Sequence, residues 1–218
     1  MVRVGSDVTW RGLGFDFNQQ RFCVAGRLDN YELSIPLLGQ HQLANAATAV
    51  AALEVLAEKG FNISRDSITN GLAKVNWPGR LQILSRHPFI VVDGAHNPDA
   101  AQRLRETLEQ YFDFDQAILI IGASDDKDIA GIATQLVPLF NKVIVTRSHH
   151  PRPMAPVTIV AEFTKHGVEA QVVDNVPSAL SEALALAEEK DLICVAGSLF
   201  VIAEVIEQVN KGSLKSQL

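Results

Sequence analysis

The sequence predicts an α/β fold: a Rossmann-like, mostly parallel sheet with helices on both faces, preceded by a small antiparallel β-meander and two helices. Beyond residue 77, nearly continuous apolar segments alternate with helix-like segments, as in parallel sheets covered on both sides. Before residue 77, short β-like segments precede two helix-like ones. Pro78 and Gly79 would interrupt any helix. We therefore expect two domains, residues 1–76 and 77–218.

The first domain is predicted to begin with short strands. Turn-forming residues at 18–20 and 29–30 divide this region. An Ala-rich helix should then span 41–59 and stop at Gly60, and Ser64 should start a second helix that ends between 71 and 76. The β-like segments are 9–10, 15–17, 22–24 and 31–35.

The second domain is predicted to alternate strands and helices, with strands rich in Val, Ile and Leu. Five parallel strands, each followed by a helix, would give a doubly covered sheet. The predicted strands are 89–93, 117–122, 142–146, 170–174 and 192–196, and the predicted helices lie near 98–112, 128–139, 156–167, 177–190 and 198–210.

Composition limits the function classes. The 218 residues carry a formal net charge of −6 without a basic stripe, so nucleic acid is not an expected partner. No apolar run approaches the ~18 residues of a membrane span, and the chain does not start like a signal peptide. Cys23 and Cys194 are isolated, which favours buried, reduced thiols. We expect a cytoplasmic protein that does not interact with membranes.

Residues 93–98 read Asp-Gly-Ala-His-Asn-Pro and lie between a predicted strand and a predicted helix. The carboxyl ends of parallel strands are where open α/β sheets bind ligands, so Asp93 and His96 are candidate functional residues. Asn97 is a weaker candidate. In the alternative structural interpretation, Asn97 caps the helix while Asp93 and His96 pair to hold the turn.

Other polar motifs contain further candidate residues. Arg80, in Trp-Pro-Gly-Arg, could bind phosphate or carboxylate at the domain junction, or form a surface ion pair. His41 and Asn45 share a helix face, which could equally be a solvated face. Ser198 follows the last strand and could bind a carboxylate or cap the next helix.

Two further loops carry charge. Lys127 lies in Ser-Asp-Asp-Lys-Asp at 124–128, where the Ser/Asp cluster could merely cap a helix. Arg147 begins a cationic stretch that includes His149 and His150 and would suit an anionic substrate. No metal-ligand pattern is displayed, so no metal site is expected from these residues.

In order, residues 39–46, 77–80, 93–98, 124–128 and 197–200 resemble the folylpolyglutamate synthase and dihydrofolate synthase branch of the Mur ligase family. That resemblance implies an ATP-dependent ligase that joins L-glutamate to a folate or dihydropteroate through an acyl phosphate, with Mg²⁺ as a cofactor. It implies adenine contact for Asn45, ATP contact for Arg80 and Asp93, and a glutamate site at His96 and Ser198. It also implies catalytic roles for Asp93 and His96, with the histidine supporting the aspartate.

The sequence departs from this family in one respect. It contains no Gly-x-x-x-x-Gly-Lys-Ser/Thr phosphate loop, whose backbone would cradle the nucleotide phosphates. We therefore expect a fragment, with 1–76 the tail of the ATPase domain and 77–218 the carboxyl-terminal glutamate-ligase domain. The resemblance then implies that the magnesium ligands lie in the missing amino-terminal region, and that ligation requires this ATPase region.

Two alternatives remain open at this point. A Mur-type cell-wall peptide ligase would share the fold, although such ligases normally have a different sequence in the turn that corresponds to residues 93–98. A nucleotide- or amino-acid-binding module without catalysis would also be consistent with the missing phosphate loop.

Overall fold

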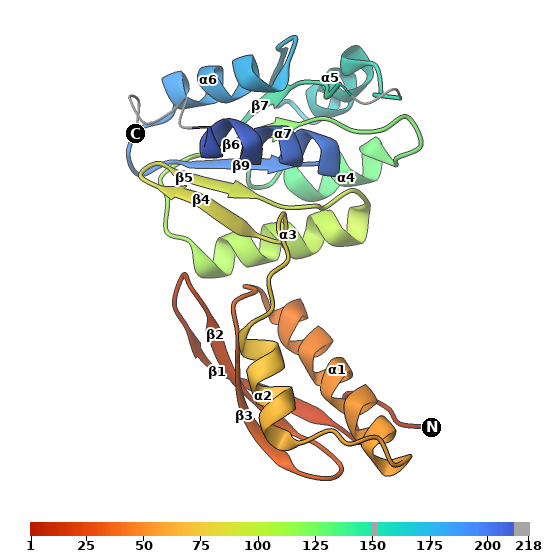
Figure 1. Ribbon diagram of the computed structural model, residues 1–218. Helices are drawn as coiled ribbons and strands as arrows, with labels where there is room; N and C mark the ends of the chain where they lie inside the picture. The colour runs from red at the N-terminus through yellow and green to blue at the C-terminus, as the bar shows by residue number, and fades with distance from the viewer. Residues whose placement is uncertain (150–151, 212–218) are drawn as a thin grey trace. The chain divides into compact units, whose positions relative to one another are not determined.

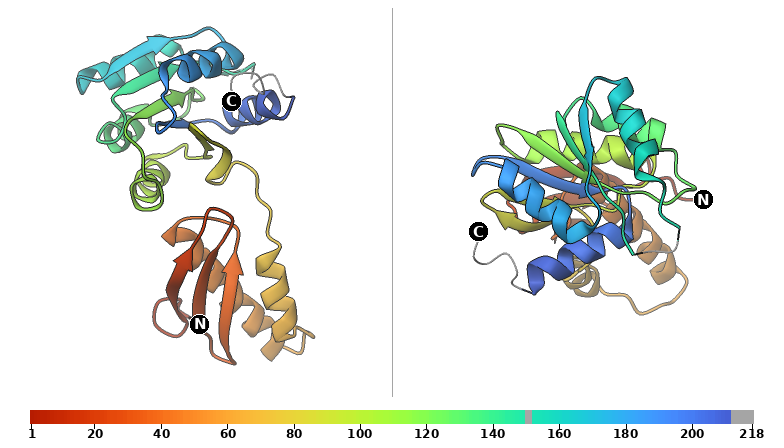
Figure 2. Two further views of the ribbon diagram at one scale, coloured as in Figure 1. Left: turned by 90° about the vertical axis from the view of Figure 1, so that its left-hand side faces the viewer. Right: turned by 90° about the horizontal axis from the view of Figure 1, so that it is seen from above.

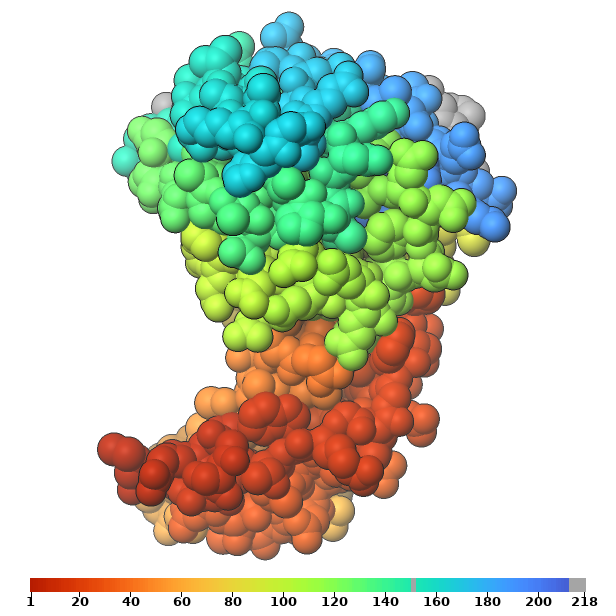
Figure 3. Space-filling model, turned by 180° about the vertical axis from the view of Figure 1, so that it is seen from behind, coloured from red at the N-terminus to blue at the C-terminus, as the bar shows by residue number. Residues whose placement is uncertain are grey.

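The computed structural model describes residues 1–149 and 152–211 and divides into two compact units, Met1–Pro78 and a second unit that starts at Gly79. The space-filling view colours the first unit red to golden and the second yellow to blue (Figure 3).

The first unit is a three-stranded antiparallel sheet with two helices on one face (Figures 1 and 2). Its strands, in spatial order, are β1 (Thr9–Phe15), β2 (Gln20–Ala25) and β3 (Asn30–Ile35). Alternate residues of β2 and β3 are buried, because successive side chains of a strand point to opposite faces. The helices α1 (Gln40–Glu58) and α2 (Arg65–Ala73) pack against this apolar face.

The prediction of separate β segments at 9–10 and 15–17 is wrong. Residues 9–10 and Phe15 belong to one strand, β1, which ends at Phe15, and residues 16–17 follow it. Its register with β2 shifts between Gly12 and Gly14, and Gly14 has a φ of 148°. Gly12 and Gly14 form an irregularity that lets the strand continue.

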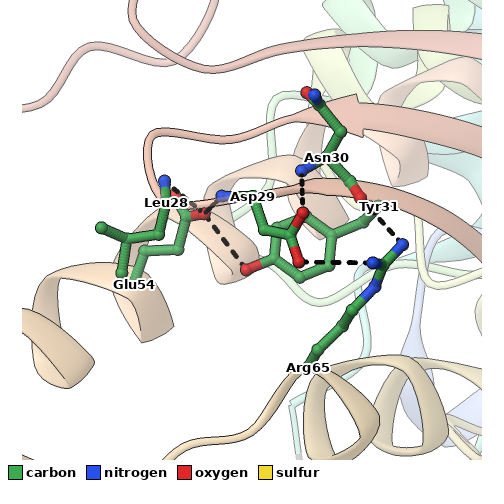
Figure 4. A network of polar contacts seen from close by, with 6 residues as sticks. All are labelled: Leu28, Asp29, Asn30, Tyr31, Glu54 and Arg65. Carbon is green, nitrogen blue, oxygen red and sulfur yellow. Dashed lines mark hydrogen bonds and ion pairs between the residues drawn. The ribbon is translucent and has the colours of Figure 1, made fainter.

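A buried carboxylate connects α1 to the turn between β2 and β3 (Figure 4). Glu54 is 1% exposed and accepts hydrogen bonds from the backbone N–H groups of Arg27, Leu28 and Asp29 at 2.8, 3.1 and 3.3 Å. The Tyr31 hydroxyl donates to it at 3.1 Å. Burial, together with the Glu54 charge, raises the pKa of Tyr31 to about 12.

The second unit contains a six-stranded sheet in the order β4-β5-β9-β6-β7-β8. All neighbouring strands pair in parallel except β4 and β5. The strands are β4 (Gln82–Arg86), β5 (Phe89–Val92), β6 (Ala117–Ile121), β7 (Lys142–Val145), β8 (Glu169–Val172) and β9 (Leu192–Ala196). The predicted α/β class, with a mostly parallel sheet and a small antiparallel sheet, is confirmed.

Strand β4 was missed because its five residues lack the alternation of a strand. Four are half-buried and one is exposed, and the register with β5 shifts between Ile83 and Ser85. Local pattern therefore gave no period-2 signal, and only pairing with β5 defines the strand.

Helices cover both faces of this sheet (Figure 1). Helices α3 to α5 pack successively on one another, and α6 packs on α7. In Figure 1, α6 and α7 lie on the opposite side of the sheet from α3 and α4. The helices are α3 (Pro98–Tyr111), α4 (Ile129–Leu136), α5 (Pro156–Lys165), α6 (Val176–Leu186) and α7 (Leu199–Asn210).

Helices α4 and α6 end three and four residues earlier than predicted. For α6, the residue after Leu186 is extended, and Asp191 accepts a hydrogen bond from the backbone of Glu188. The thiols of Cys23, half-buried, and Cys194, buried in β9, are both free. No helix among the described residues is long and apolar enough to cross a membrane.

Candidate functional site

The carboxyl ends of the central strands form the candidate site. Strand β9 lies between β5 and β6, yet it leads into α7, on the opposite side of the sheet from α3 and α4. The loop after β9 therefore leads to one face of the sheet, and the loops after β5 and β6 lead to the other face. Such a switch point is where open α/β sheets bind ligands. Close backbone approach needs glycine: a Cβ on Gly197 would lie 2.6 Å from the Gly122 oxygen, and one on Gly122 would lie 2.6 Å from the Thr146 oxygen.

Asp93 directly follows β5, and both of its carboxylate oxygens accept hydrogen bonds from backbone N–H groups. Its Oδ2 accepts from the N–H of Leu81 at 2.8 Å and its Oδ1 from that of Ala95 at 2.9 Å. Burial raises the pKa of Asp93 above its ordinary value, while these two hydrogen bonds and the charges of Arg80 and His96 oppose that shift. The carboxyl group is thus both desolvated and fixed in orientation.

His96 does not form the predicted alternative hydrogen bond with Asp93. Its Nδ1 lies 2.8 Å from the backbone oxygen of Gly94, a distance that fits an Nδ1–H donor. That tautomer leaves Nε2 as the hydrogen-bonding nitrogen for other groups. Asn97 caps α3 by accepting from the N–H of Ala100 at 2.9 Å, which is the structural role left open by the sequence.

The turn that carries Arg80 is held against the end of β5. The N–H of Gly94 donates to the backbone oxygen of Gly79 at 2.8 Å. A Cβ on Gly94 would lie 3.8 Å from Nη1 of Arg80 and 2.9 Å from Leu199, so the Arg80 guanidinium lies near the Asp93 turn. The structure therefore brings Arg80 and Asp93 together.

Ser198 lies at the same edge, because the N–H of Gly197 donates to the backbone oxygen of Ala95 at 2.8 Å. Ser198 is 8% exposed, and its hydroxyl accepts from the N–H of Phe200 at 3.2 Å, so it caps α7. The cap uses the hydroxyl oxygen only as an acceptor, so the O–H group can still donate a hydrogen bond.

The loop after β6 contains Lys127, whose ammonium donates to Asp126 at 2.8 Å. That hydrogen bond is the main cause of a lowered pKa at Asp126. The neighbouring Asp128 caps α4 by accepting from Gly131 at 2.9 Å, as the sequence alternative allowed.

The loop after β7 contains Arg147, which is exposed. Next to it, His149 donates its backbone N–H to Glu204 of α7 at 2.9 Å, and its ring Nδ1 lies 3.2 Å from the same carboxylate. Glu204, which the sequence prediction missed, thus fixes this loop. His150 of the predicted cationic stretch lies outside the described residues.

His41 and Asn45 lie in the first unit, at the start of α1, and are linked through Gln42. The Gln42 amide nitrogen lies 3.0 Å from Nε2 of His41, and its oxygen accepts from Asn45 at 3.1 Å. Sequence reasoning missed Gln42, whose side chain is among the buried ones. No described His, Cys, Asp and Glu side chains form a group of three that could hold a metal ion.

The fold and this edge define a Rossmann-like domain with carboxylate, imidazole, guanidinium and hydroxyl groups at its switch point. The chain belongs to the Mur ligase family: the family model described as Mur ligase, glutamate ligase domain matches residues 79–199. The resemblance inferred from the five motifs is confirmed at this level.

Relatives that the chain resembles are named as enzymes of the folate branch. A probable bifunctional folylpolyglutamate synthase/dihydropteroate synthase of Halobacterium salinarum is 38% identical over 171 residues, which are 78% of this chain and 20% of that protein. The folylpolyglutamate synthase of Mycobacterium tuberculosis complexed with ADP superposes with a TM-score of 0.87 at 27% identity, covering 95% of this chain and 48% of that one.

A third match is a bifunctional folylpolyglutamate synthase/dihydrofolate synthase solved with Mn, AMPPNP and L-glutamate. It has a TM-score of 0.78 at 25% identity and covers 96% of this chain and 47% of that one. The chain therefore spans a fifth of the first relative and just under half of each of these two solved chains.

Proposed function

We propose that this chain is the carboxyl-terminal part of an ATP-dependent ligase that adds L-glutamate to a folate, with dihydropteroate as a second acceptor. The observation that carries the proposal is the meeting of Arg80, Asp93, His96 and Ser198 at one sheet edge. These four residues lie within the segment that matches the glutamate ligase domain. Solved relatives carry ADP, AMPPNP or L-glutamate, which agrees with this ligand set.

Ligation of this kind needs negative charge stabilised on a transferring phosphoryl group and an amine held in line with the acyl carbon. When bound, ATP and Mg²⁺ supply the activating phosphoryl group. The Arg80 guanidinium is suited to the phosphate charge because it is a permanent, forked donor. The neighbouring Asp93 is assigned to the same nucleotide side of the site.

The glutamate side of the site is assigned to His96 and Ser198. Nε2 of His96 can accept a proton or hydrogen bond from an ammonium group, and the Ser198 hydroxyl can donate to a carboxylate. We assign 1–76 to the tail of the ATPase domain, where Asn45 would contact adenine. In this proposal the phosphate loop and the magnesium ligands come from the amino-terminal ATPase region, so the chain alone does not ligate.

The test is an assay of phosphate release by the full-length protein with ATP, Mg²⁺ and L-glutamate. Release that depends on both glutamate and a folate or dihydropteroate supports the proposal. Release with muramyl peptides instead would identify a cell-wall ligase, and nucleotide binding without turnover would indicate a binding module. Folate-dependent turnover by residues 1–218 alone would contradict the need for the ATPase region.

A further inference from the structure

The turn that carries Arg80 has a strained backbone. Among the described residues, Leu81 alone combines a positive φ, 39°, with a side chain larger than that of glycine. Gly79, two residues earlier, has a φ of 75°. Non-glycine residues rarely adopt positive φ, and such conformations persist only where surrounding contacts impose them. Some contact must therefore hold Leu81 in place.

Three hydrogen bonds hold the turn, one through Leu81 itself and two through Gly79. The Leu81 N–H donates to Oδ2 of Asp93 at 2.8 Å, and the Gly94 N–H donates to the Gly79 oxygen at 2.8 Å. From the strand side, the Gly79 N–H donates to Oε1 of Gln82 at 3.0 Å. The turn is therefore hydrogen-bonded both to the end of β5 and to the start of β4. Arg80 lies between Gly79 and Leu81, the two residues that make these bonds.

We infer that Asp93 is a positioning residue: its carboxylate locks the Gly79–Leu81 turn through the Leu81 N–H and thereby aims the Arg80 guanidinium at the bound ligand. The second oxygen of Asp93 accepts from the Ala95 N–H and ties the same carboxylate to the His96 turn. The inference rests on the proposed function, and it replaces a direct nucleotide contact of Asp93 by an effect that passes through Arg80.

A double-mutant cycle in the full-length protein separates these two roles. Asp93→Ala should lower kcat/KM for ATP by about 100-fold, as expected when a catalytic group is displaced by about 1 Å. If Asp93 acts through Arg80, the same substitution in an Arg80→Ala background should change kcat/KM by less than about threefold. Multiplicative losses in the double variant would show an independent Asp93 contact and overturn the inference.

A second variant loosens the turn without touching either residue. Gln82→Ala removes the acceptor for the Gly79 N–H and should also lower kcat/KM for ATP, again with no further loss in the Arg80→Ala background. If Gln82→Ala behaves as the wild-type protein does, the turn does not position Arg80 and the inference is wrong.

Asp191 offers a matched control. It is 5% exposed and, like Asp93, gives one oxygen to each of two backbone N–H groups, those of Gln116 at 3.1 Å and Glu188 at 2.9 Å. It lies at the amino end of β9, away from the site. Asp191→Ala should lower stability and leave KM for ATP unchanged. An equal loss of kcat/KM in both variants would attribute the Asp93 effect to general destabilisation and contradict the inference.

Amide hydrogen exchange in this chain, without nucleotide, gives a readout independent of turnover. Asp93→Ala should accelerate exchange of the Leu81 amide and leave that of Ala101, bonded to Asn97 in α3, unchanged. Unaltered Leu81 protection would overturn the inference. Absence of glutamate-dependent turnover in the wild-type protein would instead contradict the proposed function, and the exchange result would still decide the role of Asp93.

Discussion

Removing the Glu54 carboxylate should destabilise the first unit by about 3 kcal/mol. Glu54→Ala leaves three backbone N–H groups and the buried Tyr31 hydroxyl without their acceptor. Figure 4 shows the bonds from Leu28, Asp29 and Tyr31. A buried donor left unpaired costs about 1–3 kcal/mol. The full sum does not apply, since the side chains of Arg27, Leu28 and Asp29 are exposed and water can reach this turn. The Tyr31 hydroxyl, by contrast, is buried and stays unpaired.

Urea unfolding followed by Trp10 fluorescence measures this loss in the first unit. The chain has two tryptophans, and a Trp77→Phe background leaves Trp10 in the first unit as the only reporter. A loss of about 3 kcal/mol should also lower the Tm of a unit this small by about 10 °C or more.

Glu58, one turn further along α1, is the control. It forms a surface ion pair with Arg27 at 2.9 Å, with side chains 35% and 36% exposed. Glu58→Gln should therefore cost less than about 1 kcal/mol. If Glu54→Ala costs no more than Glu58→Gln, the buried carboxylate does not hold the β2–β3 turn and the reasoning fails.

Three further predictions concern the second unit. Burial raises the folded-state pKa of Asp93, so the stability of the wild-type protein relative to Asp93→Asn should fall as the pH rises above about 4. Thermal unfolding at a series of pH values measures this, and a relative stability that rises with pH would contradict it. Burial also raises the pKa of Cys194, so a thiol reagent should label half-buried Cys23 first; equal rates would refute that order. Gly197→Ala should lower the free energy of unfolding by about 1–3 kcal/mol, because φ is 93° and the new Cβ would meet the Gly122 oxygen; unchanged urea unfolding would show that the backbone adapts.

The local sequence pattern was sufficient to predict a strand where both faces of that strand are buried. The residues of β6 and β9 are all buried, and both strands were predicted because such strands read as continuous apolar runs. The half-buried β4 carries no such signal, so it was missed. The continuity of β1 through Gly12 and Gly14 was not predicted either, because a glycine adds no side chain to the alternating pattern of a strand.

Motif order likewise pointed to the residues of the site and to the family. The sequence could not say what each side chain contacts. Asn97 and Ser198 cap helices, and the Nδ1 of His96 meets a backbone oxygen rather than Asp93. Such partners depend on which backbone groups lie within hydrogen-bond distance after folding.

By itself, then, the sequence determined the fold class and the family and pointed to candidate site residues, because apolar periodicity and motif order are local properties of the chain. The tertiary structure alone decided that Asp93 binds the backbone of Leu81, twelve residues away, and that β9 lies between β5 and β6. Strand order and hydrogen-bond partners arise from pairing between distant segments, and no local pattern encodes that pairing.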